Sequence, residues 1–346
     1  THSRFLVERR CTDAVRREGI PTTIAPSSLP LPFRFQFMAD KPSSSLVLYG
    51  DGLARSVNPS HANLHSLARR ASCGFLSLAP NPQTAETEDE RIIRELAQLL
   101  DASEVSIKSG ECLDELELPK LSQRFMGMRA ALVTENLSLK SFADKLGCNV
   151  LQFSHLKNHP GLPPNVVASE SLKLLGFENG KTLEKSQFDL VLLHIGAGES
   201  DKKDETIMNN VEYINHLVGE VMELAQPGSE IGSRLHLSVL MSHGAVSKED
   251  ESCLSISMDQ NKYKPGLLSL IPRQSYMMKG GRAQRKVREF SPMLIAQWQD
   301  AVTRKDMTDM FSFKDFKKYG GNLTIPADRF LHEVAFKLWK APKYGA

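Results

Sequence analysis

The stretch Ser45-Leu-Val-Leu-Tyr-Gly-Asp-Gly52 decides the fold of this 346-residue chain. It is an apolar run that ends in glycine, and such runs are typical of strands buried on both faces of a sheet. The Asp51-Gly52 pair at its end predicts a turn. Strands without alternating polar residues belong mostly to parallel sheets that helices cover on both sides. The surrounding sequence is therefore expected to alternate strands with helices.

The rest of the chain shows that alternation. It predicts an α/β fold with a mostly parallel sheet flanked by helices on both faces. In such sheets, ligands bind beyond the carboxyl ends of the strands. The expected strands cover residues 45–50, 73–78, 129–134, 149–153, 188–195, 235–241 and 266–271, and the expected helices cover residues 61–71, 88–100, 139–146, 206–225, 293–304 and 327–339.

The composition excludes several classes of protein. The chain has 43 Lys and Arg against 41 Asp and Glu, which excludes a histone-like or polyacidic protein. With 41% hydrophobic and 24% charged residues, it is an ordinary globular sequence that can bury a core. No apolar run approaches the roughly 18 residues of a transmembrane helix, so no membrane contact is expected. Five scattered cysteines without a CxxC pair argue against disulfides and cysteine zinc sites, and for a reducing compartment.

Charge is spread unevenly along the chain. Between Glu86 and Glu117, 11 acidic residues stand against 3 basic ones, and from Lys279 to the end 14 basic residues stand against 7 acidic ones. We expect the acidic stretch to be a short insert, about residues 86–123, within an α/β domain at residues 45–278. The basic part, residues 279–346, is expected to be a helical C-terminal extension.

Residues 1–44 have no clear apolar period, and they combine scattered arginines with a proline-rich stretch. This composition predicts a disordered or leader segment, and with it a cytoplasmic protein. The alternative is an organellar transit peptide, because such peptides are rich in Arg and Ser, and it would place the protein in an organelle matrix.

Two stretches of sequence resemble known phosphate-binding motifs, and only the second remains a candidate. Gly176-Phe-Glu-Asn-Gly-Lys-Thr182 has three residues between its glycines where a phosphate loop has four, so a helix-ending glycine and a turn are expected there. A basic cluster after residue 278 is a candidate surface for a protein partner or for nucleic acid, although no aromatic residues are interleaved with it. Its members are Lys279, Arg282, Arg285, Lys286 and Arg288.

Four blocks of sequence share their order and spacing with a known family. The first joins Leu46-Val-Leu-Tyr-Gly-Asp-Gly-Leu53 to Asn63-Leu-His-Ser-Leu-Ala-Arg-Arg-Ala-Ser-Cys-Gly-Phe-Leu76. The others are residues 129–150, Phe188-Asp-Leu-Val-Leu-Leu-His-Ile195 and residues 235–244. Together they resemble the alkaline phosphatase superfamily, and within it the archaeal-type cofactor-independent phosphoglycerate mutases. The resemblance implies an alkaline-phosphatase-like fold with a reduced insertion.

The resemblance also implies a site where two divalent cations, Mn²⁺ or Zn²⁺, hold a phosphate while a Ser or Thr attacks it. Three residues match metal-binding positions of the family: Asp51 after the first strand, and Glu199 and His243 after two later strands. Asp51 and His243 keep the residue type of the family, whereas Glu199 replaces an Asp. His194 lies inside an apolar strand and is expected to be a packed histidine rather than a ligand.

Other family positions are lost in this sequence. Pro82 stands in the nucleophile position, which leaves Thr84 or Thr87 as candidates after a shift of the alignment. Lys203 and Ser242 replace a metal-binding His and Asp. The lysine ammonium offers no lone pair and would repel a cation. The remaining ligands are too few to offset the repulsion between two cations, though enough for one weakly held ion.

The sequence therefore predicts a phosphoglycerate-mutase-like protein with a degenerate metal site, which acts as a binding or scaffold protein for a protein partner rather than as an enzyme. One alternative is an active metal-dependent phosphoglycerate mutase or phosphatase with a rebuilt site, which would bind a phosphorylated small molecule. The other alternative is a nucleic-acid-associated protein that uses the basic cluster.

Overall fold

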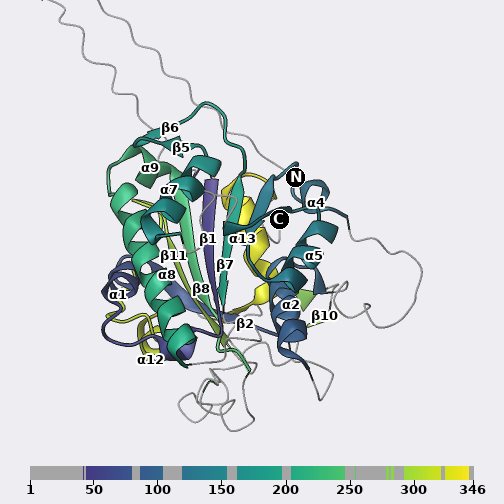
Figure 1. Cartoon of the computed structure of the whole chain (residues 1–346), viewed down its shortest axis with the longest axis horizontal. Coiled ribbons are helices and arrows are strands. Elements are labelled where there is room, and N and C mark those ends of the chain that lie inside the picture. The colour runs from purple at the N-terminus through teal and green to yellow at the C-terminus, as the bar shows by residue number, and fades with distance from the viewer. Residues whose placement is uncertain are drawn as a thin grey trace, which may run out of the picture. The chain divides into compact units, whose positions relative to one another are not determined.

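The computed structural model describes residue 42 and residues 44–79, 86–103, 119–153, 162–196, 204–245, 254, 278–279, 282–283, 292–320 and 324–342. An eight-stranded sheet organises them, in the order β12-β2-β11-β8-β1-β7-β3-β4 (Figure 1). Its strands are β1 (Ser44–Asp51), β2 (Ser72–Ser77), β3 (Ala130–Val133), β4 (Asn149–Leu151), β7 (Leu190–Gly196), β8 (Leu235–Met241), β11 (Pro292–Trp298) and β12 (Thr324–Pro326). β11 is antiparallel to β2 and β8, and the other neighbours in this sheet are parallel. The predicted α/β fold with a mostly parallel sheet is confirmed.

Helices cover both faces of the sheet (Figure 1). Residues of α1, α7, α8 and α12 pack in the apolar core on one face, and residues of α2, α5 and α13 pack in the core on the other. The bounds are α1 (Ala62–Ala68), α2 (Glu88–Leu99), α4 (Leu121–Arg124), α5 (Leu137–Lys145), α7 (Pro164–Leu174), α8 (Asp204–Leu224), α9 (Glu230–Arg234), α12 (Phe313–Tyr319) and α13 (Phe330–Lys337), with the 3₁₀ turns η1 (Ala54–Ser56) and η6 (Ala327–Arg329). Two small hairpins pair β5 (Phe177–Glu178) with β6 (Lys181–Thr182) and β9 (Met278–Lys279) with β10 (Arg282–Ala283).

β1 lies inside the sheet, and its position explains its sequence. Leu46 and Leu48 belong to the apolar core on one face of the sheet, whereas Val47 and Tyr49 belong to the core on the other face. All four are 0% exposed. β7 and β8 pair with the two edges of β1, and both faces of β1 are buried. Polar side chains in alternate positions would therefore be buried away from water, which explains why this part of the strand is apolar.

The first turn of α1 is capped from another helix. The N-cap residue of α1, His61, makes no side-chain cap bond. Instead, Oδ1 of Asn215 on α8 accepts hydrogen bonds from the backbone N–H groups of Asn63 at 3.0 Å and Leu64 at 3.3 Å. These contacts fasten the start of α1, and the loop that leads into it from β1, to α8.

The helix expected over residues 293–304 is wrong. Pro292–Trp298 forms β11 between β2 and β8, and Thr324–Pro326 forms β12 next to β2. The prediction failed because Met293-Leu-Ile-Ala296 is a short apolar run, which periodicity alone does not assign to a strand or a helix. The helix expected over residues 327–339 is confirmed by α13. The basic C-terminal region is therefore partly built into the sheet instead of extending from it.

The segment from Gly176 to Thr182 forms a turn, as predicted. Gly176 follows α7 with φ +87°, and Asn179 and Gly180, between β5 and β6, have φ +52° and +77°. These left-handed conformations suit a helix end and a hairpin turn. The strand expected at residues 266–271, residues 104–118 of the acidic insert and the N-terminal residues 1–41 lie outside the described residues. Among the described helices, none combines the length and the apolar character that crossing a membrane requires.

Candidate functional site

The carboxyl ends of β1, β7 and β8 meet at one edge of the sheet. Asp51, the last residue of β1, stands beside Gly196, the last residue of β7. Ser242 follows β8 on the other side, and its N–H donates to the carbonyl of Gly50 at 3.0 Å. We call this place, with Asp51, Gly196, Ser242 and His243, the candidate-site edge. The expectation that the residues after these strands come together is met for the described part of the chain.

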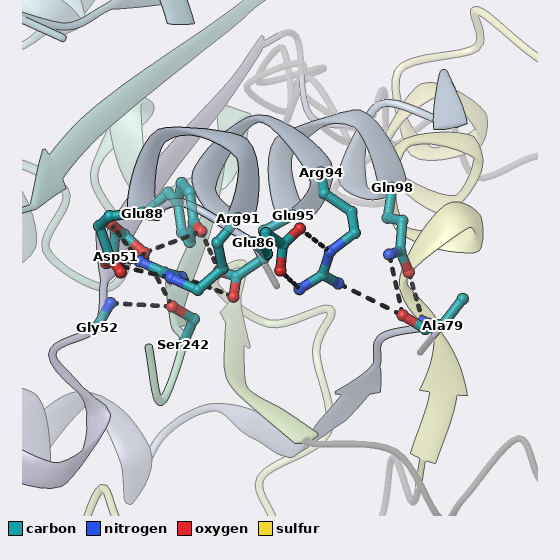
Figure 2. A network of polar contacts seen from close by, with 11 residues as sticks. Asp51, Gly52, Ala79, Glu86, Glu88, Arg91, Arg94, Glu95, Gln98 and Ser242 are labelled. Carbon is teal, nitrogen blue, oxygen red and sulfur yellow. Dashed lines mark hydrogen bonds and ion pairs between the residues drawn. The ribbon is translucent and has the colours of Figure 1, made fainter. Parts of the chain in front are cut away.

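Asp51 is enclosed in a network of hydrogen bonds (Figure 2). It is 2% exposed. Nη2 of Arg91 donates to Oδ1 at 2.8 Å and to Oδ2 at 3.1 Å. The Ser242 hydroxyl donates to Oδ1 at 3.2 Å and accepts from the N–H of Gly52 at 2.9 Å. Both carboxylate oxygens of the first candidate metal ligand therefore already bind a cation, the guanidinium of Arg91.

Arg91 brings two more carboxyl groups to the same place. Its Nη1 donates to Oε1 of Glu95 at 2.7 Å. Its Nε donates to Oε1 of Glu88 at 3.1 Å, and Nη2 also contacts that oxygen. The hydroxyl of Tyr49 donates to the other oxygen of Glu95 at 2.6 Å. We call Asp51, Glu88, Arg91 and Glu95 the Arg91 cluster, in which three carboxyl groups surround one buried guanidinium.

Charge in the Arg91 cluster is unbalanced, because three acids face one base. Burial is the main influence on the pKa of Asp51 and Glu95 and raises both, while the guanidinium of Arg91 lowers them. Burial lowers the pKa of Arg91, but the charges of Glu95 and Asp51 outweigh it and raise that pKa above its ordinary value. The guanidinium therefore stays charged, and the buried carboxyl groups hold protons more readily than exposed ones do.

The sequence of α2 explains how the cluster is positioned. Glu88, Arg91, Glu95 and Gln98 follow one another at helical spacing, so they form a polar stripe beside the apolar stripe that packs on the sheet. The side-chain carbonyl of Gln98 accepts from the N–H of Ala79 at 2.6 Å, and its amide nitrogen donates to the carbonyl of Ala79 at 3.4 Å.

Arg94, on the same helix, also contacts the Ala79 carbonyl, at 3.4 Å, and pairs with Glu86 at 2.7 Å (Figure 2). α2 therefore contacts Ala79 after β2 and Glu86 before its own start, as well as the end of β1.

The two histidines of the sequence prediction lie near this edge. His243 is 7% exposed, and its ring stands edge-on to Phe313 of α12 with centroids 6.3 Å apart. His194 lies within β7, where its Nδ1 contacts the Thr134 hydroxyl at 2.9 Å. Burial lowers the pKa of His194 to about 4, so it is neutral. A packed histidine was predicted, and the structure confirms it.

The absence of a side chain at Gly196 allows β7 to lie close to Asp51 of β1. A Cβ at Gly196 would lie 2.8 Å from Cβ of Asp51 and 3.2 Å from Nε2 of His194. A side chain at this position would therefore push β1 and β7 apart, because carbon atoms do not approach so closely.

The structure describes the positions of only some of the predicted site residues. Thr87 is the N-cap of α2: its hydroxyl accepts from the N–H of Glu90 at 3.3 Å and donates to Oε2 of Glu90 at 3.0 Å. Lys279 and Arg282 stand opposite each other in the β9–β10 hairpin. The remaining candidates, Thr84, Glu199, Arg285, Lys286 and Arg288, lie outside the described residues.

The resemblance implies divalent cations beside Asp51, and the described residues do not fit them. Arg91 takes up both oxygens of Asp51, and its positive charge repels any cation placed there. Ser242 supplies a neutral hydroxyl where the family has a carboxylate. Within the described parts of the chain, no three His, Cys, Asp or Glu side chains are grouped so that they could hold a metal ion.

The arrangement of sheet and helices defines the class of the molecule: it is an α/β protein with a mostly parallel sheet, and it shares its fold with a solved structure. The chain is similar to the PH0037 protein from Pyrococcus horikoshii, with a TM-score of 0.53 and 12% identity over 88% of this chain and 99% of that one. It is also similar to the cofactor-independent phosphoglycerate mutase from Thermoplasma acidophilum DSM 1728, with a TM-score of 0.46 and 10% identity over 86% of this chain and 100% of that one.

A protein in the alkaline phosphatase superfamily from Vibrio parahaemolyticus gives a TM-score of 0.42 and 11% identity over 79% of this chain and 69% of that one. The likeness to PH0037, at 12% identity, supports a shared fold and nothing about activity. No protein-family model matches the sequence, and no curated protein matches it.

Proposed function

We propose that this chain is a phosphoglycerate-mutase-like protein whose two-metal phosphoryl-transfer site is degenerate, and that it acts as a binding or scaffold protein. The observation that supports this is the position of Arg91, which donates to both oxygens of Asp51. In this position the protein's own side chain supplies the positive charge. A guanidinium neutralises a carboxylate, but it has no coordination position at which to activate water or a hydroxyl group.

Arg91 is also poorly placed to bind a phosphate itself. Its Nε, Nη1 and Nη2 atoms all donate to carboxylates of the Arg91 cluster. With three acids around one base, the cluster repels a phosphate dianion more than it attracts one. The cluster is therefore a stabilising element at the end of β1, and the partner binds elsewhere on the protein.

The metal content of the protein tests this proposal. Wild type and Asp51→Ala are soaked in Mn²⁺ and Zn²⁺, desalted and analysed for bound metal. We expect less than one equivalent in both, and no hydrolysis of phosphate esters. Two equivalents in wild type that disappear in Asp51→Ala, together with hydrolysis, would support the alternative of an active enzyme with Asp51, Glu199, His243 and Thr84 or Thr87 at its centre.

The sequence of the basic cluster favours an anionic partner within this proposal. Lys279 of β9 pairs directly with Arg282 of β10 in the antiparallel register. The five bases of the basic cluster lie within ten residues of the sequence, and clustered bases attract anions. Within the proposed binding function, the basic cluster is therefore the partner surface, and acidic protein segments are the partners it fits.

Retention on heparin measures how strongly this surface binds anions. Changing Lys279, Arg282, Arg285, Lys286 and Arg288 to Gln should lower the salt concentration at which the protein elutes, because phosphate- and sulfate-like contacts are screened by salt. The matched control neutralises five exposed bases elsewhere: Arg69, Lys145, Lys173, Lys181 and Lys185. Equal elution of the two variants would count against the basic cluster as a partner surface.

A further inference from the structure

Two buried histidines lie between the end of β1 and the middle of α1. His61 is 1% exposed and His65 is 6% exposed. Nδ1 of His61 accepts a hydrogen bond from the backbone N–H of Asn58 at 2.9 Å. Nδ1 of His65 accepts one from the backbone N–H of Phe311 at 3.1 Å. A backbone N–H only donates, so both Nδ1 atoms carry a lone pair and both rings are neutral, with their proton on Nε2.

The Nε2 atoms are used as well. That of His61 lies 3.3 Å from Oε2 of Glu212 on α8, and that of His65 donates to the carbonyl of Asn58 at 3.0 Å. All four ring nitrogens are therefore engaged, and the two bonds to Nδ1 depend on the neutral ring, whereas the Nε2–H donors are present in the neutral and the protonated ring alike. The Asn58 turn is held by both rings, once through its N–H and once through its carbonyl.

These bonds join segments that flank the candidate-site edge. Asn58 belongs to the loop that follows Asp51. Phe311 lies two residues before Phe313, whose ring packs against His243. The two imidazoles thus fasten two segments to α1 and α8: the loop that follows Asp51, and the segment before Phe313, whose ring packs against His243.

We propose that His61 and His65 form an acid-sensitive latch at the candidate-site edge, which holds the loop around Asn58 and the segment at Phe311 when neutral and releases them when protonated. Protonation places a hydrogen on Nδ1, which then faces the N–H of Asn58 or Phe311. An acceptor becomes a donor, so the bond is lost and two donors oppose each other. The latch would thereby regulate access to the edge of the proposed degenerate site.

The charged groups around the latch oppose one another. Glu212 of α8 faces His61 and also binds Nε2 of His216 at 2.9 Å, so its carboxylate favours protonation of both rings. Burial and the neighbouring His65 act against this, and burial prevails, so the pKa of His61 lies below its ordinary value. With its lower pKa in the closed form, His61 binds more protons in the released form than in the closed form below about pH 6.5. Release of the loop around Asn58 becomes more favourable as the pH falls, by up to about tenfold per pH unit for the proton that His61 takes up.

Amide hydrogen exchange tests the latch directly. The protection factors of the Asn58 and Phe311 amides, which are corrected for intrinsic exchange, should fall as the pH is lowered from 7.5 to 5. In His61→Asn/His65→Asn, the Asn carbonyl replaces Nδ1 as an acceptor that does not titrate, so the protection factors should stay constant. His216→Asn is the control: it removes an exposed ring that binds the same Glu212, and it should behave as wild type.

The latch is overturned if wild-type protection at both amides does not change between pH 7.5 and 5, or if the double variant keeps the wild-type slope. The ¹⁵N shifts of wild type give a second measurement that needs no variant: a proton on Nδ1 of either ring at pH 7.5 would also overturn it. These measurements involve neither metal nor partner. The latch can therefore be wrong while the proposed function is right, and the proposed function can be wrong while the latch is right.

Discussion

Arg91→Met should lower the free energy of unfolding by about 3–5 kcal/mol at neutral pH, because it leaves Asp51 and Glu95 buried without a counter-charge. Met keeps most of the length of the side chain and removes only the guanidinium. Urea denaturation measures the change without adding guanidinium, which could itself enter the vacated position. The loss should shrink as the pH falls, because protonated carboxyl groups need no counter-charge. Arg94→Met is the control: its partner Glu86 is partly exposed, so at most about 1 kcal/mol should be lost.

The same variant tests whether the Arg91 cluster can hold a metal ion. In Arg91→Met the new side chain fills most of the space that Arg91 occupied, and the surrounding carboxyl groups are not grouped to hold a metal ion, so Mn²⁺ should not restore the lost stability. Wild type should not be stabilised by Mn²⁺ at the same concentration. If Arg91→Met loses no more stability than Arg94→Met, or if Mn²⁺ stabilises wild type, the guanidinium is not the counter-charge on which the cluster depends.

Leu294→Ala and Ile295→Ala should each cost about 2–5 kcal/mol of folding free energy. These neighbours on β11 point to opposite faces of the sheet: Leu294 belongs to one apolar core and Ile295 to the other. Both are almost fully buried, at 0% and 3% exposed. Chemical denaturation of the two variants measures the cost of each cavity.

Val302→Ala is the matched control for β11, because it lies within the residues first expected to continue a helix from 293 and is 40% exposed. It should change stability by no more than about 0.5 kcal/mol. A neutral Leu294→Ala or Ile295→Ala would mean that one face of this segment is open to solvent, which would contradict a central strand.

Much of the fold could be predicted because its signals are local. β1 and β8 are apolar runs bounded by turns, and α2 has an unbroken apolar stripe, so each was located to within a residue or two. β11 was missed because its local pattern fits a strand and a helix equally well. Its identity is decided by β2 and β8, which lie far away in the sequence and pair with its two edges.

The candidate site, too, has residues whose positions could be predicted from the sequence and one residue that was missed. Asp51 and Ser242 could be placed at one edge because each directly follows a strand, and the carboxyl ends of parallel strands meet. Arg91 was missed because it lies in a stretch that is acidic overall. A signal was present: Glu88, Arg91 and Glu95 share one side of a helix beside its apolar stripe. Which acid the guanidinium would meet on β1, however, depends on how α2 docks across the sheet, and no local pattern encodes that.

The place of β11 also has a consequence for how the protein is made. During synthesis β2 and β8 leave the ribosome well before Pro292, yet β11 is the strand that joins them, and β12 follows later still. Until then, β8 and β2 present unpaired edges, which act as templates for pairing with other chains. A message that stops before Pro292 would thus yield an aggregation-prone polypeptide for the quality-control machinery to remove, and not a shorter version of the same protein.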